Sequence, residues 1–137
     1  DAAKQATPFP GVLRLLDDLK TRGVNVGIFT RNCRSATDHV IRTHEFDIDM
    51  TVTRDDAPPK PDPAGIEKFI ASWKVGRSEL LFVGDFRFDI ECGKKAGVRT
   101  ALFTNGQAPD ADLDPDHVIP DFDSFWMNLG KPALTQD

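Results

Sequence analysis

Short apolar runs alternate along the chain with longer stretches in which apolar residues recur every three or four positions. The short runs predict buried strands, and the helical spacing predicts amphipathic helices. Strands are expected at 24–29, 50–53, 80–83 and 100–103, with a short edge strand at 117–119. Helices are expected to open at Pro10 and Gly11, near Ser35, at Pro63 behind an Asp62 N-cap and near Asp89, with a last helix at 122–129. This alternation favours an α/β fold, a doubly wound, Rossmann-like parallel sheet with helices on both faces.

Two aspartates follow the apolar run 80–83. Asp85 comes directly after Gly84, and Asp89 lies four residues later, where a helix would begin. Ligands bind at the carboxyl ends of the strands in open α/β sheets, and Mg²⁺ is usually held by one or two carboxylates together with water and phosphate. The pair therefore suggests a Mg²⁺ site. An ordinary strand-to-helix turn, in which Asp89 only caps the helix, is the alternative.

Two other segments carry polar groups that could bind phosphate. Thr30, Arg31 and Asn32 follow the apolar run 24–29, and Lys60 lies among four prolines at 58–63. Proline fixes a backbone torsion, so this lysine is expected on a stiff loop. Taken singly, Thr30 is more often a strand-end hydroxyl and Lys60 a solvated surface residue.

The order of hydroxyl, lysine and acid pair resembles the haloacid dehalogenase (HAD) superfamily, in particular its phosphoglycolate-phosphatase-like hydrolases. Thr30 matches the second motif of that family, Lys60 in Lys-Pro-Asp-Pro the third, and Gly84-Asp85-x-x-x-Asp89 the fourth. The similarity runs from about residue 8 to residue 106. It implies a Mg²⁺-dependent phosphatase that acts on a small phosphorylated substrate through an aspartyl-phosphate.

The resemblance also assigns roles to individual residues. It implies that Thr30, Lys60, Asp85 and Asp89 are catalytic, and that Thr30 and Lys60 bind the substrate. The backbone N–H of Arg31 or Asn32 could add a hydrogen bond to the substrate. Asp85 and Asp89 would hold the metal, Asp89 mainly by orienting Asp85, a metal-bound water or Lys60.

One motif of the family is absent. HAD enzymes begin with a strand that ends in Asp-x-Asp-Gly-Thr, whose first aspartate is the nucleophile, whereas this chain starts at Asp1 and is expected to enter a helix near Gly11. The resemblance places the absent strand in the centre of the sheet, between 24–29 and 80–83, and the cap is normally inserted just after it. We therefore expect residues 1–137 to form a partial core that is inactive alone. It would be a fragment of a longer protein, or its gap would be filled by a dimer partner, strand complementation or a rearranged sheet.

Asp47-Ile48-Asp49-Met50-Thr51 reproduces the letters Asp-x-Asp-x-Thr. It follows a polar helix end rather than an apolar strand, and it lies between the second and third motifs. We therefore expect a solvated strand entry there, not a nucleophile.

Composition narrows the class of protein. A net charge of −5 and a pI near 5.1 provide no basic surface for nucleic acid or anionic membrane. The two cysteines cannot form a disulfide framework, and no apolar run reaches the ~20 residues of a membrane span. We expect one cytoplasmic domain with a surface loop at 108–116 and a flexible tail at 131–137.

Other functions remain open at this stage. A non-catalytic HAD-like binding or regulatory module would keep the motifs without turnover. A receiver-type signalling domain would place its acid pair early in the chain, whereas here the pair follows the lysine. Haloacid dehalogenation is a rival chemistry within the family, but it needs no metal, so the pair Asp85 and Asp89 favours phosphoryl transfer.

Overall fold

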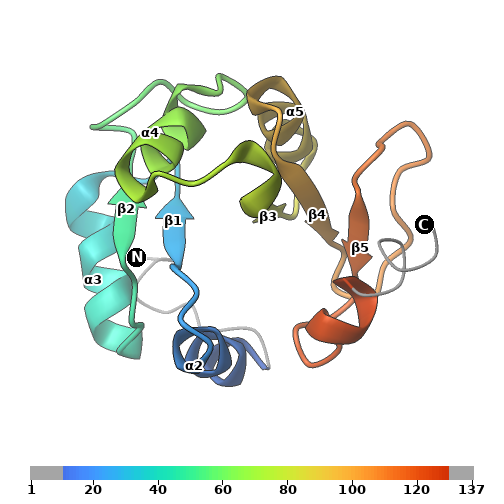
Figure 1. Ribbon diagram of the computed structural model, residues 1–137, viewed down its shortest axis with the longest axis horizontal. Coiled ribbons are helices and arrows are strands. Elements are labelled where there is room, and N and C mark those ends of the chain that lie inside the picture. Colours follow the sequence, from blue (N-terminus) through green and yellow to red (C-terminus); the bar gives the residue numbers. More distant parts are fainter. Residues whose placement is uncertain (1–10, 130–137) are drawn as a thin grey trace.

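A computed structural model describes residues 11–129 of the chain. Helices and strands alternate through most of it, as the hydrophobic pattern predicts (Figure 1). The helices are α2 (Val12–Thr21), α3 (Arg34–His44), α4 (Ala64–Trp73), the 3-10 turn η1 (Arg77–Glu79) and α5 (Arg87–Ala96). The strands are β1 (Gly27–Phe29), β2 (Met50–Val52), β3 (Leu81–Gly84), β4 (Arg99–Phe103) and β5 (His117–Ile119). Residues 125–129 are also helical.

The strands form two separate parallel sheets. β1 pairs with β2, and β3, β4 and β5 pair in that order. Every ladder is parallel, which confirms the α/β class with parallel strands. Within residues 11–129 no ladder joins β1 to β3, although the two sheets stand next to each other in Figure 1. Within this part of the chain, both strands therefore keep one unpaired edge.

The sheets are covered by helices through two apolar clusters. On one face, Ile66 of α4 and Cys92 and Ala96 of α5 pack together with Val98, Phe29 and Phe82. On the other face, Leu15 of α2 packs with Ala101, Phe103, Ile119 and Phe125. Each helix buries one stripe, as an amphipathic helix on a sheet should.

The first cluster also connects the two sheets. The rings of Phe29 on β1 and Phe82 on β3 lie 6.0 Å apart. Helix α4 approaches β1 closely because glycine stands on both sides: a Cβ on Gly65 would overlap the Phe29 ring, and a Cβ on Gly27 would overlap Phe69. Side chains and helices, rather than strand hydrogen bonds, therefore hold the two halves together.

Several element boundaries differ from the sequence expectation by a few residues. β1 begins at Gly27 rather than Val24, because the carboxylate of Asp49 takes the N–H of Val26 at 2.7 Å before the ladder starts. α4 begins after Pro63, while Asp62 accepts the N–H of Ala64 at 2.9 Å. Pro10 and the tail at 131–137 lie outside the described residues. None of the described helices is long and apolar enough to cross a membrane.

Candidate active site

Lys60 joins the carboxyl ends of β1 and β3. Its ammonium donates to the carbonyl oxygen of Phe29, the last residue of β1, at 3.3 Å. It also forms an ion pair with Oδ1 of Asp89 in the first turn of α5, at 2.8 Å. The two side chains are only 14% and 8% exposed, so the pair is shielded from water and salt. The lysine on the proline-rich loop is thus held inside the molecule.

Asp89 uses both of its carboxylate oxygens. While Oδ1 faces Lys60, Oδ2 accepts the backbone N–H groups of Asp85 and Phe86, each at 3.1 Å. A carboxylate at this position caps the helix and lies at the positive end of its dipole. Asp89 therefore fixes both the lysine and the backbone that carries Asp85. Its expected place in the metal site stays a prediction, and its contacts are those of an orienting carboxylate.

Asp85 differs from Asp89 in its surroundings. The residue is exposed, and within residues 11–129 its carboxylate makes no hydrogen bond or ion pair. Nor do any three His, Cys, Asp or Glu side chains of that part of the chain converge as a metal-binding group. One free carboxylate at the end of a strand is still compatible with Mg²⁺, which often takes one or two carboxylates and completes its shell with water and phosphate.

The loop after β1 carries the expected hydroxyl. The N–H of Thr30 donates to the carbonyl of Val52 at 3.0 Å, which continues the ladder with β2. Its Oγ1 accepts the N–H of Asn32 at 3.1 Å, so the hydroxyl proton remains available to a ligand. Arg31 and Asn32 are exposed. Thr30 lies next to Phe29, whose carbonyl binds Lys60, and therefore belongs to the same strand end.

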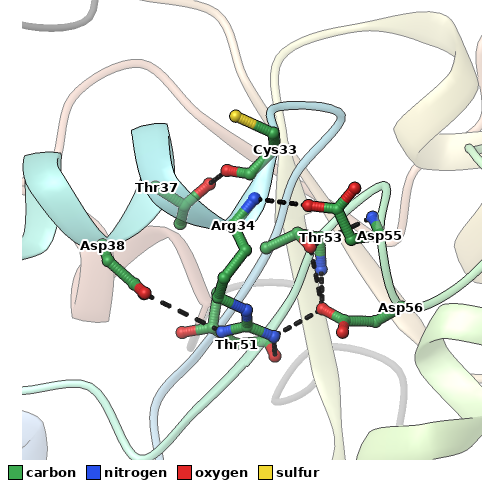
Figure 2. A network of polar contacts seen from close by, with 8 residues as sticks. All are labelled: Cys33, Arg34, Thr37, Asp38, Thr51, Thr53, Asp55 and Asp56. Carbon is green, nitrogen blue, oxygen red and sulfur yellow. Dashed lines mark hydrogen bonds and ion pairs between the residues drawn. The ribbon is translucent and has the colours of Figure 1, made fainter.

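A polar network, shown in Figure 2, ties this loop to the one after β2. Arg34, the first residue of α3, donates through Nη2 to the carbonyl of Thr51 at 3.0 Å and pairs with Asp56. Its backbone N–H donates to Asp55 at 2.8 Å. The N–H and hydroxyl of Thr53 both bind Asp56, and they hold the pKa of that carboxyl below its usual range. The network stabilises the backbone of the loop that follows Thr30.

Cys92 of α5 contacts the backbone of the loop that carries Lys60. Its thiol is fully buried, and it donates to the carbonyl of Asp62 at 3.3 Å. Burial raises the pKa of the thiol to about 11, so it stays protonated as a donor. Sequence reasoning missed this contact because it uses a backbone carbonyl, and the only available signal was the position of Cys92 one helical turn after Asp89.

The Asp47 and Asp49 segment lies at the other end of the strands. Asp49 accepts the Val26 N–H at the entrance of β1 and pairs with Lys20. The Lys20 ammonium, and then the Val26 N–H, hold the pKa of Asp49 below its usual range. Asp47 is a 76% exposed side chain that pairs with Lys20 at 3.7 Å. These acids face the amino ends of the strands, away from Lys60.

The structure thus brings together Lys60, Asp89 and the backbone of Asp85, with Thr30 at the neighbouring strand end. The arrangement places one shielded cation, one free hydroxyl proton and one exposed carboxylate around the ends of β1 and β3. These groups suit a phosphate, whose oxygens accept hydrogen bonds and bind cations.

Known proteins share this arrangement of elements. A model of the haloacid dehalogenase-like hydrolase family matches residues 1–103. A haloacid dehalogenase-like hydrolase domain-containing protein of Arabidopsis thaliana is 32% identical over 116 residues, covering 82% of this chain and 47% of that protein. A phosphoglycolate phosphatase of Rhodospirillum rubrum is 31% identical over 140 residues, covering 97% of this chain and 58% of that protein. The chain therefore spans about half the length of these curated relatives.

Solved structures show the same similarity. A 2-haloacid dehalogenase of Pseudomonas syringae superposes with a TM-score of 0.78 at 27% identity, covering 93% of this chain and 55% of that one. Both phosphatases and dehalogenases thus occur among the proteins that resemble the chain.

Proposed function

Because the chain belongs to the haloacid dehalogenase-like hydrolase family, we propose that it forms the greater part of the catalytic core of a Mg²⁺-dependent phosphatase. The substrate is a small phosphorylated metabolite, and the reaction passes through an aspartyl-phosphate. The observation that carries the proposal is the shielded Lys60–Asp89 pair beside the exposed Asp85. A lone surface lysine would need no such pairing.

Each residue has a distinct task in this proposal. Lys60 neutralises the phosphoryl oxygens, on which negative charge is spread in the transition state. Thr30 donates its hydroxyl to the same oxygens, and the backbone N–H groups of Arg31 or Asn32 add to it. Asp89 keeps the ammonium of Lys60 in place and does not contact the substrate.

The metal fits the exposed carboxylate of Asp85. Asp85 would hold Mg²⁺, and Asp89 would orient it through the Asp85 backbone. When bound, the metal supplies further positive charge to the phosphoryl group.

The nucleophile in this proposal comes from a strand that is not among residues 11–129. Among the described residues both β1 and β3 have an unpaired edge, and Lys60 spans their carboxyl ends. A parallel strand inserted between them would place an aspartate at its own carboxyl end next to Lys60. A longer form of the chain, a dimer partner or another polypeptide could supply it. The substrate is a small molecule rather than nucleic acid or membrane, and the acidic composition and free cysteines support a cytoplasmic location.

The main alternative is a non-catalytic HAD-like binding or regulatory module. It is favoured by the position of Asp47 and Asp49, because these acids lie at the amino ends of the strands and cannot serve as the nucleophile beside Lys60. Haloacid dehalogenation would not require Asp85 as a metal ligand, since that reaction needs no metal.

The first test of the proposal uses NMR to monitor the binding of inorganic phosphate in the presence of Mg²⁺. We expect shifts at Thr30 and Asn32 in the wild type and in Lys68→Met, an exposed-lysine control, and none in Lys60→Met. Unchanged binding in Lys60→Met would contradict the proposal.

Turnover then separates an enzyme from a binding module. We expect no measurable phosphatase activity from the chain alone, because hydrolysis of phosphate monoesters is among the slowest uncatalysed reactions. Adding a peptide that ends in Asp-x-Asp-Gly-Thr should give Mg²⁺-dependent phosphate release, whereas its Asn-x-Asp-Gly-Thr counterpart should not. Activity of the chain alone that is abolished by Asp47→Asn would instead assign the nucleophile to Asp47.

A further inference from the structure

Two exposed phenylalanines stand beside the acid pair. Phe86 directly follows Asp85 and is 56% exposed, and Phe88 precedes Asp89 and is 37% exposed. Their rings meet edge to face, with centroids 5.4 Å apart. Single exposed apolar residues are common, but a contacting pair of aromatic rings at a site calls for a physical reason.

Helix formation does not explain Phe86. It occupies the N-cap position of α5, where Ser, Thr, Asp or Asn is strongly preferred because their side chains accept an N–H of the first turn. Asp89 provides an acceptor for the helix end instead, since its Oδ2 binds the N–H of Phe86. The ring of Phe86 makes no contribution to the cap and lies outside both apolar clusters.

The backbone places Phe86 beside the site. The N–H of Phe86 is bonded to the same carboxylate that holds Lys60, and its neighbour Asp85 carries the free acid. Phe86 is therefore the sequence neighbour of Asp85, the exposed acid of the proposed phosphate site.

The arginine next to these rings in sequence is already paired. Arg87 stands between the two phenylalanines in sequence, but its guanidinium pairs with Asp112 at 3.0 Å and with Asp110 at 3.8 Å. Because Arg87 is already paired, it offers little to a second anionic group on a substrate, whereas an apolar group would find two ring surfaces.

From these observations, and resting on the phosphatase function proposed above, we propose that Phe86 and Phe88 form an aromatic platform. It contacts the leaving group of the phosphorylated substrate and selects an aromatic or apolar leaving group over a small polar one. The phosphate would lie between Lys60 and Asp85, and the body of the substrate would extend across the two rings.

The test compares two esters of equal charge, phenyl phosphate and methyl phosphate. An NMR titration measures the affinity of the full chain for each ester in the presence of Mg²⁺. Aromatic contacts contribute enough to tighten binding by about two- to tenfold. We therefore expect the wild type to bind phenyl phosphate about two- to tenfold more tightly than methyl phosphate.

Phe86→Ser combined with Phe88→Ala is the matched variant. Serine restores a favourable N-cap, so the helix should form at least as well as in the wild type. Met127→Ala, which removes a 67% exposed apolar side chain elsewhere, is the control. The affinity ratio should fall to about one in the Phe86 and Phe88 variant and stay at the wild-type value in the control.

The outcomes distinguish the two proposals. Equal affinity of the wild type for both esters would overturn the platform and leave the phosphatase proposal intact. The same would follow if the variant kept the wild-type ratio. A wild type that binds neither ester would contradict the platform and the phosphate site together.

Discussion

Gly84 and Asp89 lie so close together that a Cβ on Gly84 would overlap the Asp89 side chain. The reason is steric rather than conformational, because Gly84 does not have a positive φ. The end of β3 is thus pressed against the first turn of α5. This contact places the carboxylate of Asp89 within reach of Lys60 on one side and of two backbone N–H groups on the other.

Gly84→Ala should therefore disturb the site and the fold together. A methyl group at this position forces Asp89 away from Lys60, and overpacking of this kind costs about 2 kcal/mol of unfolding free energy. Urea denaturation measures the effect. Gly76→Ala is the matched control, because the nearest atom to its Cβ is the flexible end of Glu79 at 3.2 Å. Equal stability of the two variants would contradict the steric argument.

Lys60 and Asp89 should show strong energetic coupling. Removal of one partner leaves the other poorly solvated, so Lys60→Met and Asp89→Asn are each expected to cost about 3 kcal/mol. The double variant should lose less than the sum of the two by about 1–3 kcal/mol in a double-mutant cycle.

The exposed pair of Lys94 and Asp114, with 46% and 93% exposed side chains, serves as the comparison for this cycle. Its coupling should stay below about 1 kcal/mol. Coupling of equal size in the two pairs would show that shielding at Lys60 has no energetic consequence.

Asp85→Asn should separate metal binding from stability. The carboxylate of Asp85 makes no hydrogen bond or ion pair within residues 11–129, so the change in unfolding free energy should stay within about 0.5 kcal/mol. Calorimetry should nevertheless show weaker binding of Mg²⁺ than in the wild type. Unchanged Mg²⁺ binding would move the metal to Asp47, Asp49 or other surface carboxylates.

The edges of β1 and β3 that have no partner strand within residues 11–129 should be visible in amide hydrogen exchange. Thr30 donates to Val52 and Val26 accepts from Asp49, so even-numbered residues of β1 face β2. By the two-residue period of a strand, the N–H groups of Gly27 and Phe29 face the other edge. They should exchange faster than those of Ile28 and Thr30, and a peptide ending in Asp-x-Asp-Gly-Thr should slow them. Strong protection of Phe29 in the chain alone would contradict the open edge.

Cys92 should make stability depend on alkaline pH. Its pKa rises from 9.0 to about 11 on folding, because burial disfavours the thiolate. Between those values the folded state binds more protons than the unfolded state, so stability falls as pH rises, by roughly 2–3 kcal/mol in total.

Cys92→Ala should lack this part of the pH dependence while sharing the titration of every lysine. Denaturation of the two proteins at about pH 9 and about pH 11 provides the comparison. Equal losses of stability would show that the thiol does not titrate differently in the two states.

The sequence predicts the elements well because each carries its own local signal. Apolar runs mark the strands, and the spacing of Ile66 and Phe69 marks the buried stripe of α4. Boundaries depend on single side chains that reach across the fold. Asp49 shortens β1 through the Val26 N–H, and no local pattern near Val26 records this.

The candidate site also combines residues that have a local sequence signal with contacts that depend on the tertiary fold. Thr30, Lys60 and Asp85 follow recognisable strand and loop signals, so their order along the chain is informative. The buried ion pair with Asp89, the carbonyl of Phe29 and the thiol of Cys92 are tertiary contacts. They depend on how β1 and β3 are placed relative to each other, which hydrophobic periodicity cannot determine.

The division of the sheet also bears on cooperativity. Elements from β1 to α4 and from β3 to β5 form two groups that meet through helix packing, Phe29 with Phe82, and Lys60 with Asp89. Within residues 11–129 the two groups share no ladder, so strand hydrogen bonds do not couple their unfolding. The phosphate site exists only when both groups are folded and in contact. A strand inserted between them would join both groups in one sheet and assemble the site in the same step.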